Sequence, residues 1–111
     1  MKNSAFRSVL LMTLLLQGLQ VLSQTGTIRG FVFDAVSNDP IPFATVVLEG
    51  EASGASTDFD GAFELINVPA GLRNVTVSFV GYESKTVYEL EVTPARPAVI
   101  RVGLTEQAVA I

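Results

Sequence analysis

The chain has 111 residues, 49% of them apolar and 16% charged, and it contains no Cys and no His. That length allows one small domain, and the missing residue types remove thiol chemistry, the usual general base and the commonest zinc ligands. Seven basic and eleven acidic side chains give a net charge of -4, the wrong sign for binding a phosphate backbone. We therefore expect neither an enzyme nor a nucleic-acid-binding protein.

Residues 1–23 have the pattern of a secretory signal peptide. Lys2 and Arg7 precede an apolar run over 9–16, polar residues then break the apolarity, and a small residue stands before Gln24. The pattern predicts export, with cleavage leaving Gln24 as the new N-terminus. The alternative is an uncleaved membrane anchor, but a spanning helix needs about 20 mainly apolar residues, and three Gln fall inside that window.

The chain after the signal alternates apolar and polar residues in short runs separated by Gly, Pro, Asn and Asp, as β-strands and turns do. Seven strands are expected, over 27–33, 44–49, 55–57, 62–66, 72–80, 85–92 and 98–104. Such spacing predicts an all-β domain over 24–104, a seven-stranded antiparallel Greek-key β-sandwich. Residues 105–111 show neither a turn nor a partner strand, and we expect them to begin a linker to a downstream domain.

The alternation also assigns faces to the strands. Residues grouped on one face are Ile28, Gly30 and Val32; Ala44, Val46 and Leu48; Phe63 and Leu65; Val75, Val77 and Phe79; Thr86, Tyr88, Leu90 and Val92; and Ile100, Val102 and Leu104. The other face of strand 85–92 carries Val87, Glu89 and Glu91, and we expect it to point outward. Phe31, Phe33 and Phe59 fall on a second face, where they either cover the opposite sheet or form a docking surface.

We interpret three residues as having structural roles. Gly30, inside a strand, allows a neighbouring backbone or a large ring to approach closely. Gly61 closes the Asp58–Gly61 turn and is free to take a positive φ. The ring of Tyr82 follows a strand end, where we expect it to cover one open end of the core.

Five ordered motifs carry a family resemblance. They are Gly-Thr-Ile-Arg-Gly at 26–30, Pro-Ile-Pro-Phe-Ala-Thr-Val at 40–46, Thr-Asp-Phe-Asp-Gly-Ala-Phe at 57–63, Val-Pro-Ala-Gly at 68–71 and Val-Ser-Phe-Val-Gly-Tyr at 77–82. Together they resemble the carboxypeptidase regulatory-like domain over about 26–104, which implies a seven-stranded transthyretin-like sandwich and brings no catalytic residue. Phe43 stands where this family more often has Gly.

In exported proteins of Gram-negative bacteria such a domain looks like the start of many TonB-dependent outer-membrane receptors, and 104–111 resembles the join toward the TonB box. The resemblance implies a non-catalytic periplasmic module of a receptor for nutrient uptake, located on the periplasmic side of the outer membrane. Its implied partners are the downstream plug and barrel or a periplasmic protein, and indirectly the TonB system. The alternative is a stand-alone secreted or periplasmic module that binds carbohydrate or protein. A regulatory piece of a peptidase ranks last.

The sequence offers few residues for chemistry. Asp58 and Asp60 suggest calcium, but an EF-hand register around them lacks the first carboxylate and the bidentate Glu, so we expect a structural turn. Ser84 and Lys85 are neighbours in a strand and point to opposite faces. Asn74 begins a glycosylation sequon, which we interpret as an ordinary exposed strand position. We therefore expect no catalytic, cofactor-binding or metal-binding residue and no cofactor.

Overall fold

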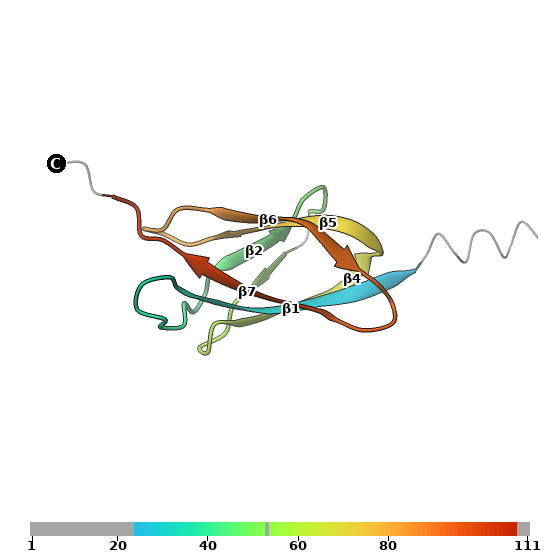
Figure 1. The fold of residues 1–111 in the computed structure, drawn as a ribbon, viewed down its shortest axis with the longest axis horizontal. Helices are drawn as coiled ribbons and strands as arrows, with labels where there is room; N and C mark the ends of the chain where they lie inside the picture. The colour runs from blue at the N-terminus through green and yellow to red at the C-terminus, as the bar shows by residue number, and fades with distance from the viewer. Residues whose placement is uncertain (1–23, 53, 109–111) are drawn as a thin grey trace, which may run out of the picture.

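The computed structural model describes residues 24–52 and 54–108, and the predicted signal segment 1–23 lies outside this range. Its elements are β1 (Thr25–Asp34), β2 (Thr45–Leu48), β3 (Gly54–Ser56), β4 (Ala62–Pro69), β5 (Gly71–Ser78), β6 (Lys85–Val92) and β7 (Ala98–Leu104). They form two sheets, with strand orders β4-β1-β7 and β3-β2-β5-β6 (Figure 1). The predicted all-β, seven-stranded sandwich is confirmed. Within the described ranges, no helix is long and apolar enough to cross a membrane.

The pairing of β1 with β7 departs from the antiparallel expectation. The two strands run parallel and side by side, in a register that extends from Ile28 opposite Ala98 to Asp34 opposite Leu104. Because β7 follows β6 of the other sheet, no hairpin joins it to β1 and forces an antiparallel direction. Alternation in the sequence shows which face of the sheet a residue occupies, but it does not show whether the neighbouring strand runs parallel or antiparallel.

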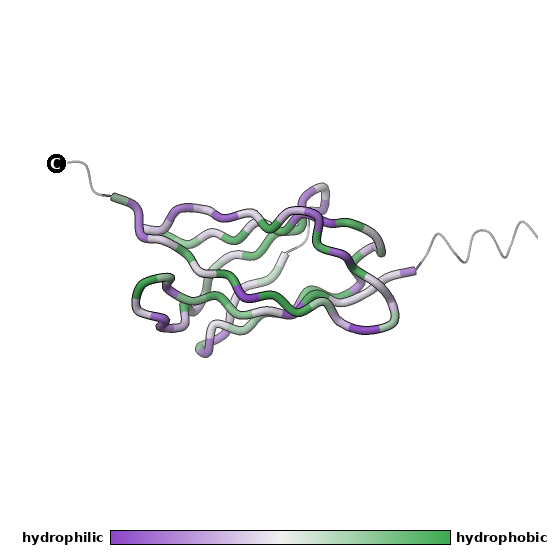
Figure 2. Tube along the Cα trace, viewed as in Figure 1, coloured by the Kyte–Doolittle hydropathy of each residue, from purple (hydrophilic) through white to green (hydrophobic). Residues whose placement is uncertain are grey.

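The core lies between the two sheets and uses the predicted faces of β1, β2, β4, β5 and β7. Fully buried side chains come from both layers, among them Ile28, Val32, Val46, Val75, Val77, Val102 and Leu104. Figure 2 shows the corresponding alternation of hydrophobic and hydrophilic residues along the strands. Burying this apolar surface is the main driving force available to a domain with no disulfide.

The predicted faces of β6 are wrong in its first half. Tyr88 is 71% exposed and Val87 packs against the core instead, while Thr86 pairs with Thr76 on the outer face. The cause is an irregularity in the β5–β6 register, where Glu89 takes a φ of 53°. Such a bulge inserts an extra residue and exchanges the two faces of the strand before it, so the predicted inward positions of Leu90 and Val92 hold.

Most strand ends lie within one residue of the sequence expectation, but the start of β1, at Thr25 rather than residue 27, and the ends of β4 and β5 differ by more. β5 stops at Ser78 rather than at residue 80, because the Tyr82 N–H donates to the Phe79 carbonyl in a tight turn. β4 continues to Pro69 rather than stopping at residue 66, because its last residues pair with the first residues of a longer β1. The predicted turn after β4 therefore shrinks to the residues around Ala70.

The predicted structural roles of Gly30 and Gly61 are confirmed. A Cβ on Gly30 would lie 2.6 Å from the ring atoms of Phe63 and 2.7 Å from the Ile100 carbonyl oxygen. Gly61 has a φ of 75°, and its carbonyl accepts a hydrogen bond from the Val32 N–H. The turn before β4 is thus tied directly to β1.

In the segment before β2, one buried hydroxyl adds to backbone hydrogen bonds such as that from the Phe43 N–H to the Thr57 carbonyl. Thr57 Oγ1 donates to the Ile41 carbonyl at 2.7 Å and accepts from the Ala44 N–H at 2.8 Å. Between these two contacts Phe43 has a φ of 60°, a region that residues with a Cβ enter at a cost. The conformation explains physically why a Gly suits this position.

Candidate functional site

A side-chain hydrogen bond between distant segments lies at the end where β7 leaves the sandwich. Tyr82 Oη donates a hydrogen bond of 2.7 Å to Asp34 Oδ2, and its ring packs against Phe79 with the centroids 5.9 Å apart. Tyr82 is half-buried against the core. The predicted role of its ring as a cover for an open end of the core is confirmed.

Asp34 also shapes the loop that follows β1. Its Oδ1 accepts hydrogen bonds from the N–H groups of Val36 and Ser37, at 2.8 and 3.0 Å. The Ser37 N–H and then the Tyr82 hydroxyl lower the pKa of Asp34, because both stabilise the carboxylate. In turn, the bond to Asp34 raises the pKa of Tyr82 to about 12. The loop contacts follow from the residue types, whereas the contact with Tyr82 left no signal in the sequence.

The segment after β7 pairs with the loop between β5 and β6. The Glu83 N–H donates to the Thr105 carbonyl, and the Gln107 N–H donates to the Gly81 carbonyl, each at 2.9 Å. The expectation that 105–111 has no partner is therefore wrong for this part of the segment. These two bonds, with the bond between Tyr82 and Asp34, are called the exit clasp below. They set the direction in which the chain leaves the sandwich.

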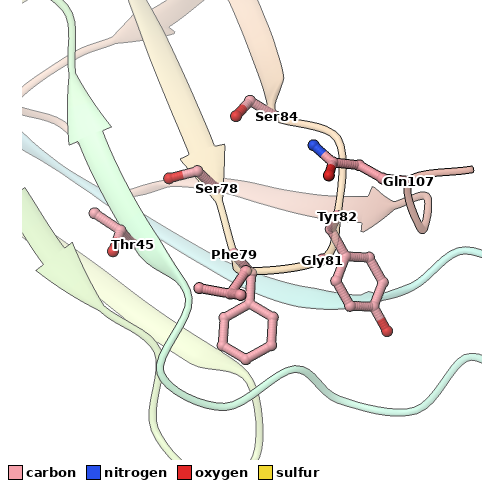
Figure 3. A pocket seen from close by; sticks show the side chains of 8 residues that line it. Thr45, Ser78, Phe79, Gly81, Tyr82, Ser84 and Gln107 are labelled. Carbon is pink, nitrogen blue, oxygen red and sulfur yellow. The ribbon is translucent and has the colours of Figure 1, made fainter. Parts of the chain in front are cut away.

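A hollow of about 390 Å³ lies beside the exit clasp. Figure 3 shows its lining, which includes Thr45, Ser78, Phe79, Tyr82, Ser84 and Gln107. Ser84 faces this hollow and Lys85 does not line it, as expected for neighbours in an extended chain. The described lining offers hydroxyls, one amide, two aromatic rings, the Val80 side chain and backbone groups, which suit hydrogen-bonded and apolar contact.

Aromatic rings are exposed on the outer face of the β4-β1-β7 sheet and beside it. Phe31 is 46% exposed and Phe59 is 79% exposed, so neither covers the opposite sheet. Phe59 meets Phe43 edge to face, with the ring centroids 5.3 Å apart. Phe33 is half-buried, and the guanidinium of Arg101 lies 5.1 Å from its ring centroid.

The remaining polar candidates have structural partners. Asp58 Oδ1 accepts from the N–H groups of Asp60 and Ala62, both at 2.9 Å, which is the expected turn. Asn74 is not a free strand position, because its amide donates to Glu49 and accepts from the Glu89 N–H at the β6 bulge. Among the residues that the structure describes, no three metal-ligating side chains gather.

Comparison with known sequences finds one domain family and receptors of one class. The family profile of the carboxypeptidase regulatory-like domain matches residues 27–105. The chain is 31% identical over 85 residues to TonB-dependent receptor P3 of Formosa agariphila. It is 35% identical over 84 residues to TonB-dependent receptor SusC of Bacteroides thetaiotaomicron. The two matches cover 77% and 74% of this chain but 8% of each receptor.

Solved structures share the sandwich. A cohesin–X-dockerin complex from Acetivibrio cellulolyticus gives a TM-score of 0.65 at 23% identity, covering 78% of this chain and 61% of the matched chain. The pilus 2b backbone protein of group B streptococcus gives 0.54 at 15% identity, covering 76% of this chain and 42% of that one. At such low identity the likeness concerns the fold alone.

Proposed function

This chain belongs to the carboxypeptidase regulatory-like domain family, and from that premise we propose that it is a non-catalytic module of a TonB-dependent outer-membrane receptor for nutrient uptake. The observation that carries the proposal is the similarity to two such receptors across most of the described sandwich. The module would stand on the periplasmic side of the outer membrane, after export directed by residues 1–23. Its partners would be the plug and barrel of the receptor or a periplasmic protein, and indirectly the TonB system.

The geometry supports a role in contact and placement. The hollow beside the exit clasp offers hydroxyls and an amide, and Asp34 and Asp58 use their carboxylates to hold turns. The exit clasp holds residues 105–107 on the sandwich, so whatever follows leaves from a defined point.

The first experiment is to read the DNA downstream of Ile111 and the neighbouring genes. A plug and barrel in the same reading frame or in an adjacent gene is expected. Their absence from every frame and neighbour would refute the receptor assignment. If the domain then showed saturable binding to members of a polysaccharide panel, the stand-alone binding module would replace it.

The second experiment tests the module inside such a receptor. Deleting residues 27–105 is expected to reduce growth on the transported nutrient while the barrel still reaches the outer membrane, as judged by fractionation. Normal growth at normal receptor abundance would show that the module does not contribute to uptake.

A further inference from the structure

β7 forms an open edge of its sheet. The strand order is β4-β1-β7, so β7 has β1 on one side and no described strand on the other. The Leu104 carbonyl accepts from the Ala35 N–H and therefore points toward β1. Because backbone groups alternate in direction along a strand, the N–H and C=O groups of Val99, Arg101 and Gly103 point away from β1. These three residues line the outer edge of the sheet.

The chain already pairs along this edge just beyond the end of β7. Thr105 accepts from the Glu83 N–H, and Gln107 donates to the Gly81 carbonyl, so the alternation of the edge continues into these two residues. The bridge between the two segments is antiparallel. Among the described residues, no such backbone partner meets the outward groups of β7 itself. The edge is therefore occupied at its end and open along the strand.

The other three edge strands carry features that hinder pairing with another chain. β3 has three residues, and β6 has three charged side chains and a bulge at Glu89. β4 contains Asn67 at a φ of 56° and ends in Pro69. Short length, bulges, charges and proline are the usual means by which sheet edges avoid unwanted pairing. β7 has seven residues, an unbroken register with β1 and one charge, that of Arg101.

Apolar side chains beside the β7 edge are incompletely covered. Ala98 and Ile100 of β7 and Val87 and Leu90 of β6 pack against the core and remain partly exposed. They line the side of the sandwich where the edges of the two sheets meet, since β6 and β7 are in contact. A strand added to β7 would direct every second side chain toward this side of the core. Apolar residues at those positions would bury more of the exposed surface.

Arg101 specifies the charge of a fitting partner. Its side chain is exposed and its guanidinium lies over the Phe33 ring, and no carboxylate of the described residues forms an ion pair with it. In an antiparallel pair, the residue opposite Arg101 lies on the same face, where opposite charges attract and like charges repel. A second copy that used all three outward residues of β7 would place Arg101 against itself. The edge therefore favours a carboxylate.

We propose that β7 is a strand-addition site for an extended segment of a partner protein, bound antiparallel, with apolar residues toward the core and a carboxylate opposite Arg101. The use of this site inside a receptor rests on the function proposed above. The pairing itself belongs to the domain and is measured on the chain alone.

An NMR titration of the full chain with a synthetic peptide tests the proposal. The probe is a capped peptide of seven residues, the length of β7, with the sequence Thr-Thr-Val-Glu-Val-Thr-Thr. At saturation we expect hydrogen exchange to slow by about ten-fold or more at Val99, Arg101 and Gly103. The amides of Val102 and Leu104, which already point toward β1, should change less. No saturable shift up to about 5 mM peptide, or slowing without this alternation, would overturn the proposal.

A charge exchange tests the role of Arg101. Replacing the central glutamate of the peptide by lysine should weaken binding by about five-fold. The exposed variant Arg101→Glu should reverse the preference and bind the lysine peptide more tightly than the glutamate peptide. Equal affinity of both peptides for the wild-type chain would refute an acidic partner.

Removing single backbone donors tests the pairing. N-methylation of the central residue of the peptide should weaken binding by about ten-fold or more, because the Arg101 carbonyl then has no donor. Val99→Pro removes an outward N–H without breaking the ladder to β1 and should have a similar effect, whereas the matched control Val99→Thr keeps that N–H. Binding that tolerates N-methylation would show that backbone pairing is not the mode of contact.

Self-association is the remaining outcome. If the same three amides exchanged slowly in the free chain and faster on dilution, β7 would be an interface between copies, and the partner segment would be wrong. None of these results bears on the receptor assignment, which depends on the neighbouring genes and on uptake.

Discussion

Tyr82 and Asp34 are 48 positions apart in the chain, and the hydroxyl of the first donates a hydrogen bond of 2.7 Å to the carboxylate of the second. The bond joins the loop after β5 to the last residue of β1, at the end of the sandwich where the chain leaves. Both groups titrate, and each shifts the pKa of the other. Their contact therefore makes stability depend on pH at both ends of the scale.

At alkaline pH we expect the domain to lose stability between about pH 10 and 12. Asp34 raises the pKa of Tyr82 from 10.0 to about 12, so the native state favours the protonated phenol, and this contribution disappears as pH rises through the folded pKa. Urea unfolding at stepped pH values measures the loss. Tyr82→Phe should be less stable at pH 7 and should lose less between pH 10 and 12. Tyr88→Phe, an exposed control, should keep the wild-type slope, and an unchanged slope in Tyr82→Phe would contradict the assignment.

At acid pH the same contact stabilises the domain less as the pH falls, whereas at alkaline pH it does so as the pH rises. The pKa of Asp34 is lowered from 3.8, so its contribution is complete above that value and is lost as pH falls through the lower folded pKa. Asp34→Asn should be less stable than the wild type at pH 7, and the difference should shrink as pH falls below about 4. Tyr82→Phe removes the second of the two main causes of the lowered Asp34 pKa. The loss of its stability at acid pH should lie between those of the wild type and Asp34→Asn. Equal differences at pH 7 and pH 2 would rule out this role for the Asp34 charge.

The hydroxyl of Thr57 offers a test of the segment before β2. Thr57→Val keeps the shape but leaves the Ile41 carbonyl and the Ala44 N–H without the partner that they have at 2.7 and 2.8 Å. We expect a loss of about 1–3 kcal/mol in the free energy of unfolding, read from the denaturant midpoint. Thr57→Ser retains the hydroxyl and should lose clearly less. If Thr57→Ser lost more stability than Thr57→Val, packing of the methyl group would hold the segment more strongly than the hydrogen bonds do.

The sequence predicts those parts of this fold that depend on local alternation. The number of strands and the core faces of five of them follow from period-two patterns, as in β1 with Ile28 and Val32. The parallel direction of β7, the bulge at Glu89 and the bond between Tyr82 and Asp34 depend on contacts between distant segments. No local pattern encodes such contacts, which explains why the faces of β6 and the partner of residues 105–107 were missed.

The backbone conformation of Phe43 gives a physical reason for the family's preference for Gly at this position. Its φ of 60° costs about 1–2 kcal/mol for a residue with a Cβ, and the ring is 60% exposed, so it recovers little by burial. After the larger unfolded-state entropy of Gly is subtracted, Phe43→Gly should stabilise the domain by about 0.5–1 kcal/mol. Gly61→Ala, at another positive φ, should do the reverse. Phe59→Ala removes the ring contact alone, and destabilisation by Phe43→Gly would mean that this contact outweighs the strain.

Asn74 should control the bulge that reverses the faces of β6. Its Oδ1 accepts the Glu89 N–H at 2.9 Å, and its Nδ2 donates to Glu49 Oε2 at 2.8 Å, so one amide joins β5, the bulge and the end of β2. Asn74→Ala removes both bonds and is expected to cost about 1–2 kcal/mol. It should also speed hydrogen exchange at the Glu89 amide, because that N–H loses its acceptor.

Asn74→Asp separates the two contacts of Asn74. It keeps an acceptor for Glu89 but places a second carboxylate beside Glu49, so exchange at the Glu89 amide should stay slow while added salt restores part of the lost stability. Fast exchange at that amide in the Asp variant would show that the bulge depends on the bridge to Glu49 rather than on the accepted N–H. Because Val87 reaches the core only through this bulge, the outcome also tells whether the inner face of β6 is set by one polar side chain of the neighbouring strand.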